Sequence, residues 1–224
     1  MKDITKRLPV VLLSLLLIPS LIFNFLYYQK DKKVRQDNTV TSVVDGDTFV
    51  LTTGQRIRLS NIYAPELELC GGKEAKERLE DLVLNKEVRI ETSNEDVFNR
   101  ALGLVYVKDT LVNEALLKDG FVRYDGTPNP KRDVLKAAYD LAVKEKRGLH
   151  GPPCRAFEPD NPECLIKANI ERASGEKWYY YPGCQSYPQV MVEKDLGESW
   201  FCTEKEAQKA GFNKGTSCAG RVYK

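Results

Sequence analysis

The chain has 224 residues, which is room for one ordinary domain and a small second one. Its 34 basic and 32 acidic residues leave a net charge of +2, so any nucleic-acid binding has to come from a local patch rather than from gross charge. A single histidine excludes nucleases that need a histidine pair, and the absence of a Gly-x-Ser-x-Gly elbow or a Gly-Lys-Ser/Thr phosphate loop leaves triad hydrolases and nucleoside-triphosphatases without support.

The N-terminus carries an uncharged apolar segment, Leu8 to Tyr28, which is about as long as a bilayer-spanning helix requires. A cleaved signal peptide would end in a small-residue cleavage site, and residues 22–29 offer none, so the sequence favours an uncleaved signal anchor. We therefore predict one transmembrane helix within residues 1–29, followed by a polar tether at residues 30–37.

Six cysteines follow this segment, and an even number behind a membrane anchor favours disulfides in an oxidising compartment. The chain has no Cys-x-x-Cys pair, which argues against a standard zinc site. Cys70 has no obvious partner. The plausible pairs among the others are Cys154 with Cys164, and Cys184 with either Cys202 or Cys218. We expect a single-pass protein of the cell membrane whose residues from about 30 onward are extracytoplasmic.

Between residues 38 and 152 the hydrophobic pattern predicts short strands interrupted and followed by helices. A hairpin with its turn at Thr52–Gln55 opens this region. Further strands are expected at Glu87–Thr92 and Ala101–Val107, and helices at Lys73–Leu84, Val112–Lys118 and Asp133–Lys146. The last helix is amphipathic, with an inward face of Val134, Leu135, Ala138, Leu141 and Ala142. We predict an α+β fold: a five-stranded OB-type β-barrel capped by about three helices.

A proline- and cysteine-containing linker is expected at residues 153–164, and a small disulfide-rich module at residues 165–224. The one helix expected in the module is Glu204–Ala210, with Thr203 as its N-cap. A module of this size buries little core, so disulfides are expected to stabilise it. Its aromatic run Trp178–Tyr181 has two interpretations: core packing, or exposed rings that stack on bases or bind wall glycan.

The charges of the hairpin suggest chemistry. Asp45 and Asp47 open its first strand, Arg58 lies within the second, and Glu66 follows that strand just past a proline. Strand alternation can bring Asp47, Arg58 and Glu66 together. Such a patch suits phosphate-ester chemistry, because it offers a carboxylate for a metal, a guanidinium for phosphate and a base for water. The alternative is an Asp-Gly turn with solvated charges.

A fourth residue, Arg100, lies before the strand predicted at Ala101–Val107. With it, residues 38–152 resemble the staphylococcal nuclease (thermonuclease) family. The matching stretches, in order, are Asp45-Gly46-Asp47-Thr48, Arg58-Leu59, Ala64-Pro65-Glu66, the Arg100 turn, and Val112-Asn113-Glu114-Ala115-Leu116 with Gly120. Residues 166–218 resemble a small domain found after nuclease domains of this family in bacterial surface or secreted proteins, which implies no particular function.

The resemblance implies the barrel fold and a calcium-dependent phosphodiesterase acting on DNA and RNA. By position, Asp47 would be a Ca²⁺ ligand, and Glu66 would activate or orient the attacking water. Arg58 and Arg100 would hold the scissile phosphate. These residue types suit those roles, because Ca²⁺ takes oxygen ligands and guanidinium groups match phosphate oxygens.

Two positions depart from the family pattern. Tyr63 stands where the family has the second carboxylate ligand, and a neutral phenol is a poor Ca²⁺ ligand, so the metal site is expected to be weakened. Val97-Phe98 replaces a Lys-Tyr pair that contacts a nucleotide phosphate. We therefore predict an extracytoplasmic nuclease with two alternatives. One is a catalytically weakened surface protein that only binds nucleic acid, and the other is a structural or adhesive protein whose working part is the C-terminal module.

Overall fold

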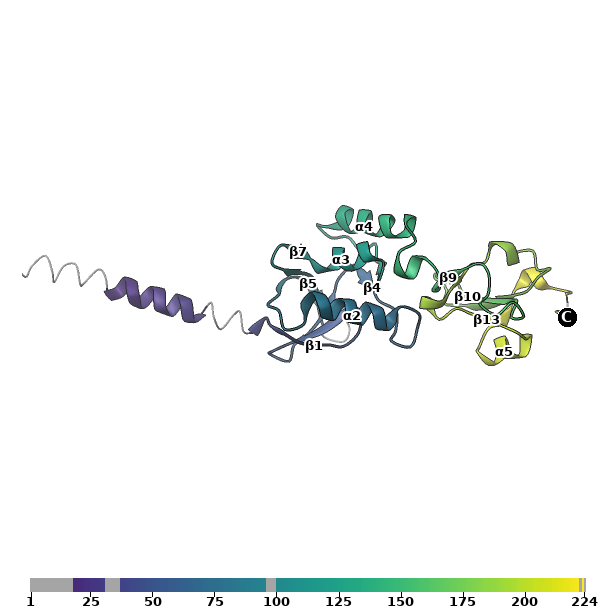
Figure 1. Ribbon diagram of the computed structural model, residues 1–224, viewed down its shortest axis with the longest axis horizontal. Coiled ribbons are helices and arrows are strands. Elements are labelled where there is room, and N and C mark those ends of the chain that lie inside the picture. The colour runs from purple at the N-terminus through teal and green to yellow at the C-terminus, as the bar shows by residue number, and fades with distance from the viewer. Residues whose placement is uncertain (1–17, 31–36, 96–99, 222, 224) are drawn as a thin grey trace, which may run out of the picture.

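The computed structural model describes residues 18–30, 37–95, 100–221 and 223 (Figure 1). Residues 18–30 form a helix at one end of the molecule, and the C-terminal module (residues 165–224) lies at the other end. The large apolar side chains of this helix are more than half exposed. Across the described residues, no helix is both long and apolar enough to cross a membrane. Residues 1–17, which include the first part of the predicted transmembrane helix, lie outside them.

The main sheet has six strands, and five of them follow the order β1-β2-β3-β6-β5. Their bounds are β1 Val40–Val43, β2 Thr48–Leu51, β3 Arg56–Leu59, β6 Ala101–Val107 and β5 Arg89–Glu95, and β7 (Thr110–Leu111) also pairs with β6. The β2–β3 pair is the predicted hairpin, with Thr48 opposite Arg58. β3 and β6 run parallel, whereas the other pairs are antiparallel.

The sheet is not closed into a barrel by strand pairing, so the predicted closed barrel is wrong in this respect. Its two outer strands meet through an isolated bridge between Thr39 and Glu87. Backbone hydrogen bonds of 3.0 Å, from Val40 N to Lys86 O and from Val88 N to Asn38 O, flank that bridge. The contact therefore falls where the chain enters β1 and β5, and not along the strands.

Three helices accompany the main sheet: α2 (Gly72–Val83), α3 (Val112–Asp119) and α4 (Arg132–Lys144). α2 buries Ala75, Leu79 and Val83, one residue per turn, against the sheet core. α3 ends at Gly120, whose φ of 81° is the left-handed conformation that glycine adopts without strain.

The inward face of α4 is narrower than predicted. Leu135, Ala138 and Ala142 are buried, whereas Val134 and Leu141 are 44% and 37% exposed. The two exposed residues lie on the edge of the apolar stripe, where the helix turns toward solvent. The prediction was wrong for these two positions.

The C-terminal module contains a four-stranded sheet of order β13-β10-β11-β14. The strands are β13 Ser199–Phe201, β10 Ile166–Ile170, β11 Lys177–Tyr180 and β14 Asn213–Lys214. α5 (Glu204–Lys209) begins at the predicted N-cap Thr203, which forms a capping box with Glu206. Tyr179 and Tyr181 are 0% and 1% exposed within a second hydrophobic cluster, so core packing is the correct interpretation for these two rings.

Three disulfides form, and their pairing differs from the prediction. Cys154 does not pair with Cys164. The bonds are Cys70–Cys154, Cys164–Cys202 and Cys184–Cys218. Only the last was among the expected alternatives. The first closes a sequence separation of 84 residues, so only the folded chain brings its two cysteines together.

Two short strand pairs lie beside the sheets. β4 (Ile62–Tyr63) pairs with β8 (Arg123–Tyr124), and β9 (Arg155–Ala156) pairs with β12 (Val192–Glu193). β9 lies within the segment predicted as a linker, and its partner belongs to the C-terminal module. That segment is therefore attached to the module by strand pairing.

Candidate active site

Asp47 is the central side chain of the site. It lies in the turn between β1 and β2 and is 2% exposed. Its Oδ2 receives the Arg58 guanidinium at 2.8 Å and the backbone N–H of Ala64 at 3.1 Å. Its Oδ1 accepts a hydrogen bond of 2.9 Å from the Thr48 hydroxyl. One carboxylate thus joins the turn, strand β3 and the segment that follows β4.

The environment of Asp47 changes its acidity. Burial raises its pKa from 3.8 to about 6, and the positive charge of Arg58 opposes that rise. Above about pH 6 the side chain is therefore a carboxylate paired with Arg58. Asp47 binds the Nη2 end of the Arg58 guanidinium and leaves its other N–H groups available to a ligand.

Arg58 lines a cavity of about 600 Å³ together with Tyr63, Leu102 and Leu104. Its side chain is 22% exposed. In the parallel β3–β6 pair, Arg58 lies opposite Leu102 and Ile57 lies opposite Ala101. A guanidinium with free N–H groups at a cavity is suited to bind phosphate oxygens.

Arg100 directly precedes β6 and is partly buried. Side chains alternate along a strand, so extension of β6 by one residue places Arg100 on the face of Leu102 and Leu104, which is the face that borders the cavity. Arg100 thus lies one residue before the strand that pairs with β3, which carries Arg58. The rest of the predicted turn, residues 96–99, including Val97-Phe98, lies outside the described residues.

Glu66 is exposed and lies two residues after Ala64, whose backbone N–H donates to Asp47. Its carbonyl oxygen accepts a 2.9 Å hydrogen bond from Leu69 N, and Gly72 packs against the same carbonyl. A Cβ at position 72 would lie 2.0 Å from that oxygen. The backbone of Glu66 is therefore held from both sides, while its carboxylate faces solvent.

Tyr63 occupies the position where the resemblance implies a second carboxylate. It is 41% exposed in β4 and lines the cavity. Burial raises the pKa of Tyr63 above 10.0, and the negative charges of Glu66 and Asp47 raise it further. The side chain is therefore a neutral phenol at physiological pH, close to the carboxylates and Arg58.

These residues do not fit a conventional calcium site. Asp47 contributes one carboxylate, and both of its oxygens already accept from protein donors, one of which is cationic. Ca²⁺ takes six to eight oxygen ligands, usually from several carboxylates and carbonyls. No group of three or more acidic, cysteine or histidine side chains suited to a metal occurs among the described residues. The predicted weak Ca²⁺ site at Asp47 stays a prediction.

The cavity also has a wall that the sequence analysis did not predict. The loop of residues 125–130 lines it, and Asn61 secures this loop by donating from Nδ2 to Thr127 O at 2.6 Å. Asn61 adopts a φ of 62° and is 7% exposed. The loop sequence, rich in Gly, Pro, Asp and Asn, was the available signal for an ordered turn.

His150 lies away from the cavity lining. It is 3% exposed, and its ring meets Tyr139 edge-on with centroids 5.0 Å apart. Burial, together with the positive charge of Arg123, lowers the pKa of His150 from 6.5 to about 4. This environment suits a structural role for His150.

Comparison with known proteins identifies relatives of this chain. Residues 56–150 match the family model described as staphylococcal nuclease homologue. An uncharacterized endonuclease of Haemophilus influenzae is 32% identical over 109 residues, covering 47% of this chain and 61% of that protein, which is less than two thirds of its length. The micrococcal nuclease of Shigella flexneri is 33% identical over 136 residues, covering 54% of this chain and 76% of the relative. An uncharacterized endonuclease of Escherichia coli O157:H7 is 33% identical over 118 residues, covering 49% and 74%.

The chain belongs to the staphylococcal nuclease family. The family predicted from the sequence is thereby confirmed. The matched range includes Arg58, Glu66 and Arg100, whereas Asp47 and the C-terminal module lie outside it.

Proposed function

We propose that the chain hydrolyses phosphodiester bonds of DNA, RNA or both at the site formed by Arg58, Glu66 and Arg100. The observation that carries this proposal is the double contact of Asp47 Oδ2, at 2.8 Å to Arg58 and 3.1 Å to Ala64 N. It holds a phosphate-binding cation beside the segment that presents the Glu66 carboxylate.

In the proposed reaction Glu66 accepts a proton from a water molecule, or orients it, as the water oxygen attacks phosphorus. The bond between phosphorus and the leaving oxygen breaks, and the leaving oxygen takes up a proton from solvent. Arg58 and Arg100 donate hydrogen bonds to the non-bridging oxygens, whose negative charge grows in the pentavalent transition state. Asp47 keeps Arg58 oriented and is buried away from the reacting atoms.

We propose only weak Ca²⁺ binding at Asp47 and a correspondingly weak dependence of cleavage on calcium. Because the donors at Asp47 and Tyr63 do not make up a full Ca²⁺ site, none of these steps passes through a metal. Replacing Tyr63 by Asp would supply the missing carboxylate, and we expect Tyr63→Asp to raise cleavage in the presence of Ca²⁺ relative to chelator.

The test is digestion of single-stranded DNA and RNA by the native protein and Glu66→Gln. Glu68→Gln is the matched control, because Glu68 is an exposed carboxylate two residues further along. We expect Glu66→Gln to lower the rate by about 10²- to 10⁴-fold, the typical contribution of a general base, and Glu68→Gln to cleave like the native protein. Equal cleavage by all three proteins would show that Glu66 does not act in the reaction.

A second candidate function is nucleic-acid binding without hydrolysis, and Tyr63 is the observation that favours it. A native protein that binds single-stranded DNA in a salt-dependent manner, does not cleave it, and gains cleavage as Tyr63→Asp would support this candidate. A protein with no affinity for nucleic acid would instead support a structural or adhesive role of the C-terminal module.

We also propose that the protein is anchored in the cell membrane by its N-terminal segment, with the remainder extracytoplasmic. The exposed apolar side chains of the helix at residues 18–30 and the three disulfides support this location. Membrane fractionation with protease added to intact cells tests it. Degradation of the chain beyond residue 30 is expected, and full protection would contradict the proposal.

A further inference from the structure

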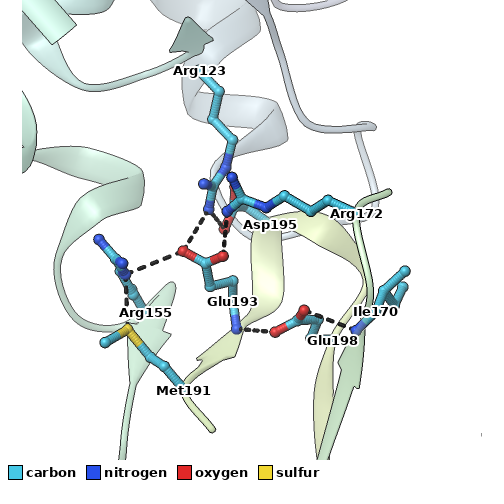
Figure 2. A network of polar contacts seen from close by, with 8 residues as sticks. All are labelled: Arg123, Arg155, Ile170, Arg172, Met191, Glu193, Asp195 and Glu198. Atoms are coloured by element: carbon cyan, nitrogen blue, oxygen red, sulfur yellow. Dashed lines mark hydrogen bonds and ion pairs between the residues drawn. The ribbon is translucent and has the colours of Figure 1, made fainter. Parts of the chain in front are cut away.

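Arg123 links the β4–β8 strand pair to the C-terminal module. It lies in β8 and is 7% exposed. Its Nε and Nη2 donate to the two carboxylate oxygens of Asp195 at 2.6 and 2.9 Å, and Nη2 also lies 3.1 Å from Glu193 Oε1. Figure 2 shows Arg123 reaching from its own strand into the acidic pair of the module. A bidentate pair of this kind fixes direction as well as distance.

The acidic partners are themselves held within the module. Asp195 is 1% exposed, and Glu193 also pairs with Arg155 at 3.1 Å and with Arg172 (Figure 2). The backbone N–H of Glu193 donates to Glu198 at 2.7 Å. The carboxylates that receive Arg123 therefore belong to a buried, hydrogen-bonded part of the module.

β8 transmits this contact to the candidate active site. Arg123 is the register partner of Tyr63 in the β4–β8 pair, and Asp125 N donates to Asn61 O at 2.9 Å. The residue after Tyr63 is Ala64, whose N–H is bound by Asp47. The charge of Asp195 is also close enough to act on the Tyr63 phenol. A displacement of Arg123 would therefore move the strand that presents the catalytic segment.

The Cys70–Cys154 disulfide provides a second connection at the other end of that segment. Cys70 lies four residues after Glu66, and Cys154 O accepts a 2.8 Å hydrogen bond from Lys194 N, next to Asp195. The segment of residues 62–70 is thus connected to Asp195 through Arg123 at one end and to Cys154, which is hydrogen-bonded to Lys194, at the other.

We propose that Arg123 is a positioning residue and that the C-terminal module, through Asp195, is a structural part of the nuclease site. The module holds β8, β8 holds β4, and β4 sets the position of Ala64 and Glu66. This inference rests on the proposed function for its kinetic consequence, while its structural consequence can be measured without any activity.

The experiment compares the full-length native protein with Asp195→Asn and with Arg172→Gln as the matched control. Arg172 contacts the same Glu193, but its side chain is 60% exposed and it belongs to the C-terminal module rather than to the β4–β8 pair. Amide hydrogen exchange at Ala64 and Leu69 reports the position of the segment, and kcat and KM on a single-stranded oligonucleotide report catalysis.

We expect Asp195→Asn to exchange about tenfold faster at both amides, because local opening of the segment becomes easier. We expect kcat to fall by about 10- to 100-fold with little change in KM, since small misplacements of a catalytic group are this costly. Arg172→Gln should match the native protein in all three measurements.

A second variant guards against loss of folding. Arg123→Lys keeps the buried positive charge but loses the planar fork, so it should fold and show the same changes to a smaller degree. Native-like exchange and kcat in both Asp195→Asn and Arg123→Lys would overturn the inference. If the native protein cleaves no nucleic acid, the proposed function fails, and the exchange rates alone still decide whether the module positions the segment.

Discussion

Asn113 offers the sharpest test of how the fold holds β3 and β6 together. It is 0% exposed at the start of α3. Its Oδ1 accepts from Val105 N at 2.9 Å, and its Nδ2 donates to Ser60 O at 2.8 Å and to Gly103 O at 3.3 Å. One amide thus ties the end of β3, which carries Arg58, to the middle of β6.

Replacing Asn113 by Ala leaves Val105 N and Ser60 O without this partner, whereas Gly103 O still accepts from Ser60 N at 2.9 Å. An unsatisfied buried backbone group costs about 1–3 kcal/mol, so two of them lower the free energy of unfolding by about 2–6 kcal/mol. Asn113→Asp should cost more at neutral pH, because its carboxylate would face two carbonyl oxygens.

The assay is urea unfolding followed by far-UV circular dichroism, with Lys118→Ala as the control on the exposed face of the same helix. Surface substitutions of that kind usually change the free energy of unfolding by no more than about 0.5 kcal/mol. An Asn113→Ala protein within about 0.5 kcal/mol of native would refute the reasoning, since the buried hydrogen bonds would then contribute nothing measurable.

Three further predictions concern acidity, cross-linking and backbone packing. His150 has a pKa of about 4 in the folded protein and 6.5 in its ordinary state, so between these pH values the unfolded chain binds a proton that the folded chain does not. The free energy of unfolding is therefore highest above pH 6.5 and falls by about 3 kcal/mol as the pH drops to 4. His150→Leu should lose less of its thermal stability over this pH range. Joint replacement of Cys70 and Cys154 by Ser opens a loop of 84 residues and should lower the free energy of unfolding by about 4–5 kcal/mol in the chain-entropy model, checked by urea unfolding against the native protein with its disulfides intact. Gly72→Ala puts a methyl group 2.0 Å from Glu66 O, so it should lower both stability and cleavage; native melting and native kcat would contradict the packing argument.

Local elements were predictable because their signals are local. β6 has the bounds expected from its apolar run, and α2 begins within one residue of its predicted start, since helical and strand periodicity are written into neighbouring residues. The pairing of Asp47 with Arg58 was likewise expected from alternation across one hairpin, and the structure shows it at 2.8 Å.

The long-range features could not be predicted in this way. Arg123 meets Asp195 across 72 residues, and nothing near either residue distinguishes this buried pair from solvated charges. The Cys70–Cys154 bond is similar, because the choice of partner depends on how the segment of residues 62–70 packs in the folded chain. The hydrophobic pattern also could not predict that the sheet stays open. Contact between its two outer edges depends on where β1 and β5 begin and not on the residues within them.

The most direct test of the account is a paired measurement of binding and cleavage of a single-stranded oligonucleotide by the native protein and Glu66→Gln. The account predicts that both proteins bind with similar affinity, because the two arginines are intact, and that only the native protein cleaves at an appreciable rate. A native protein that binds without cleaving, or a Glu66→Gln protein that cleaves equally well, would contradict it.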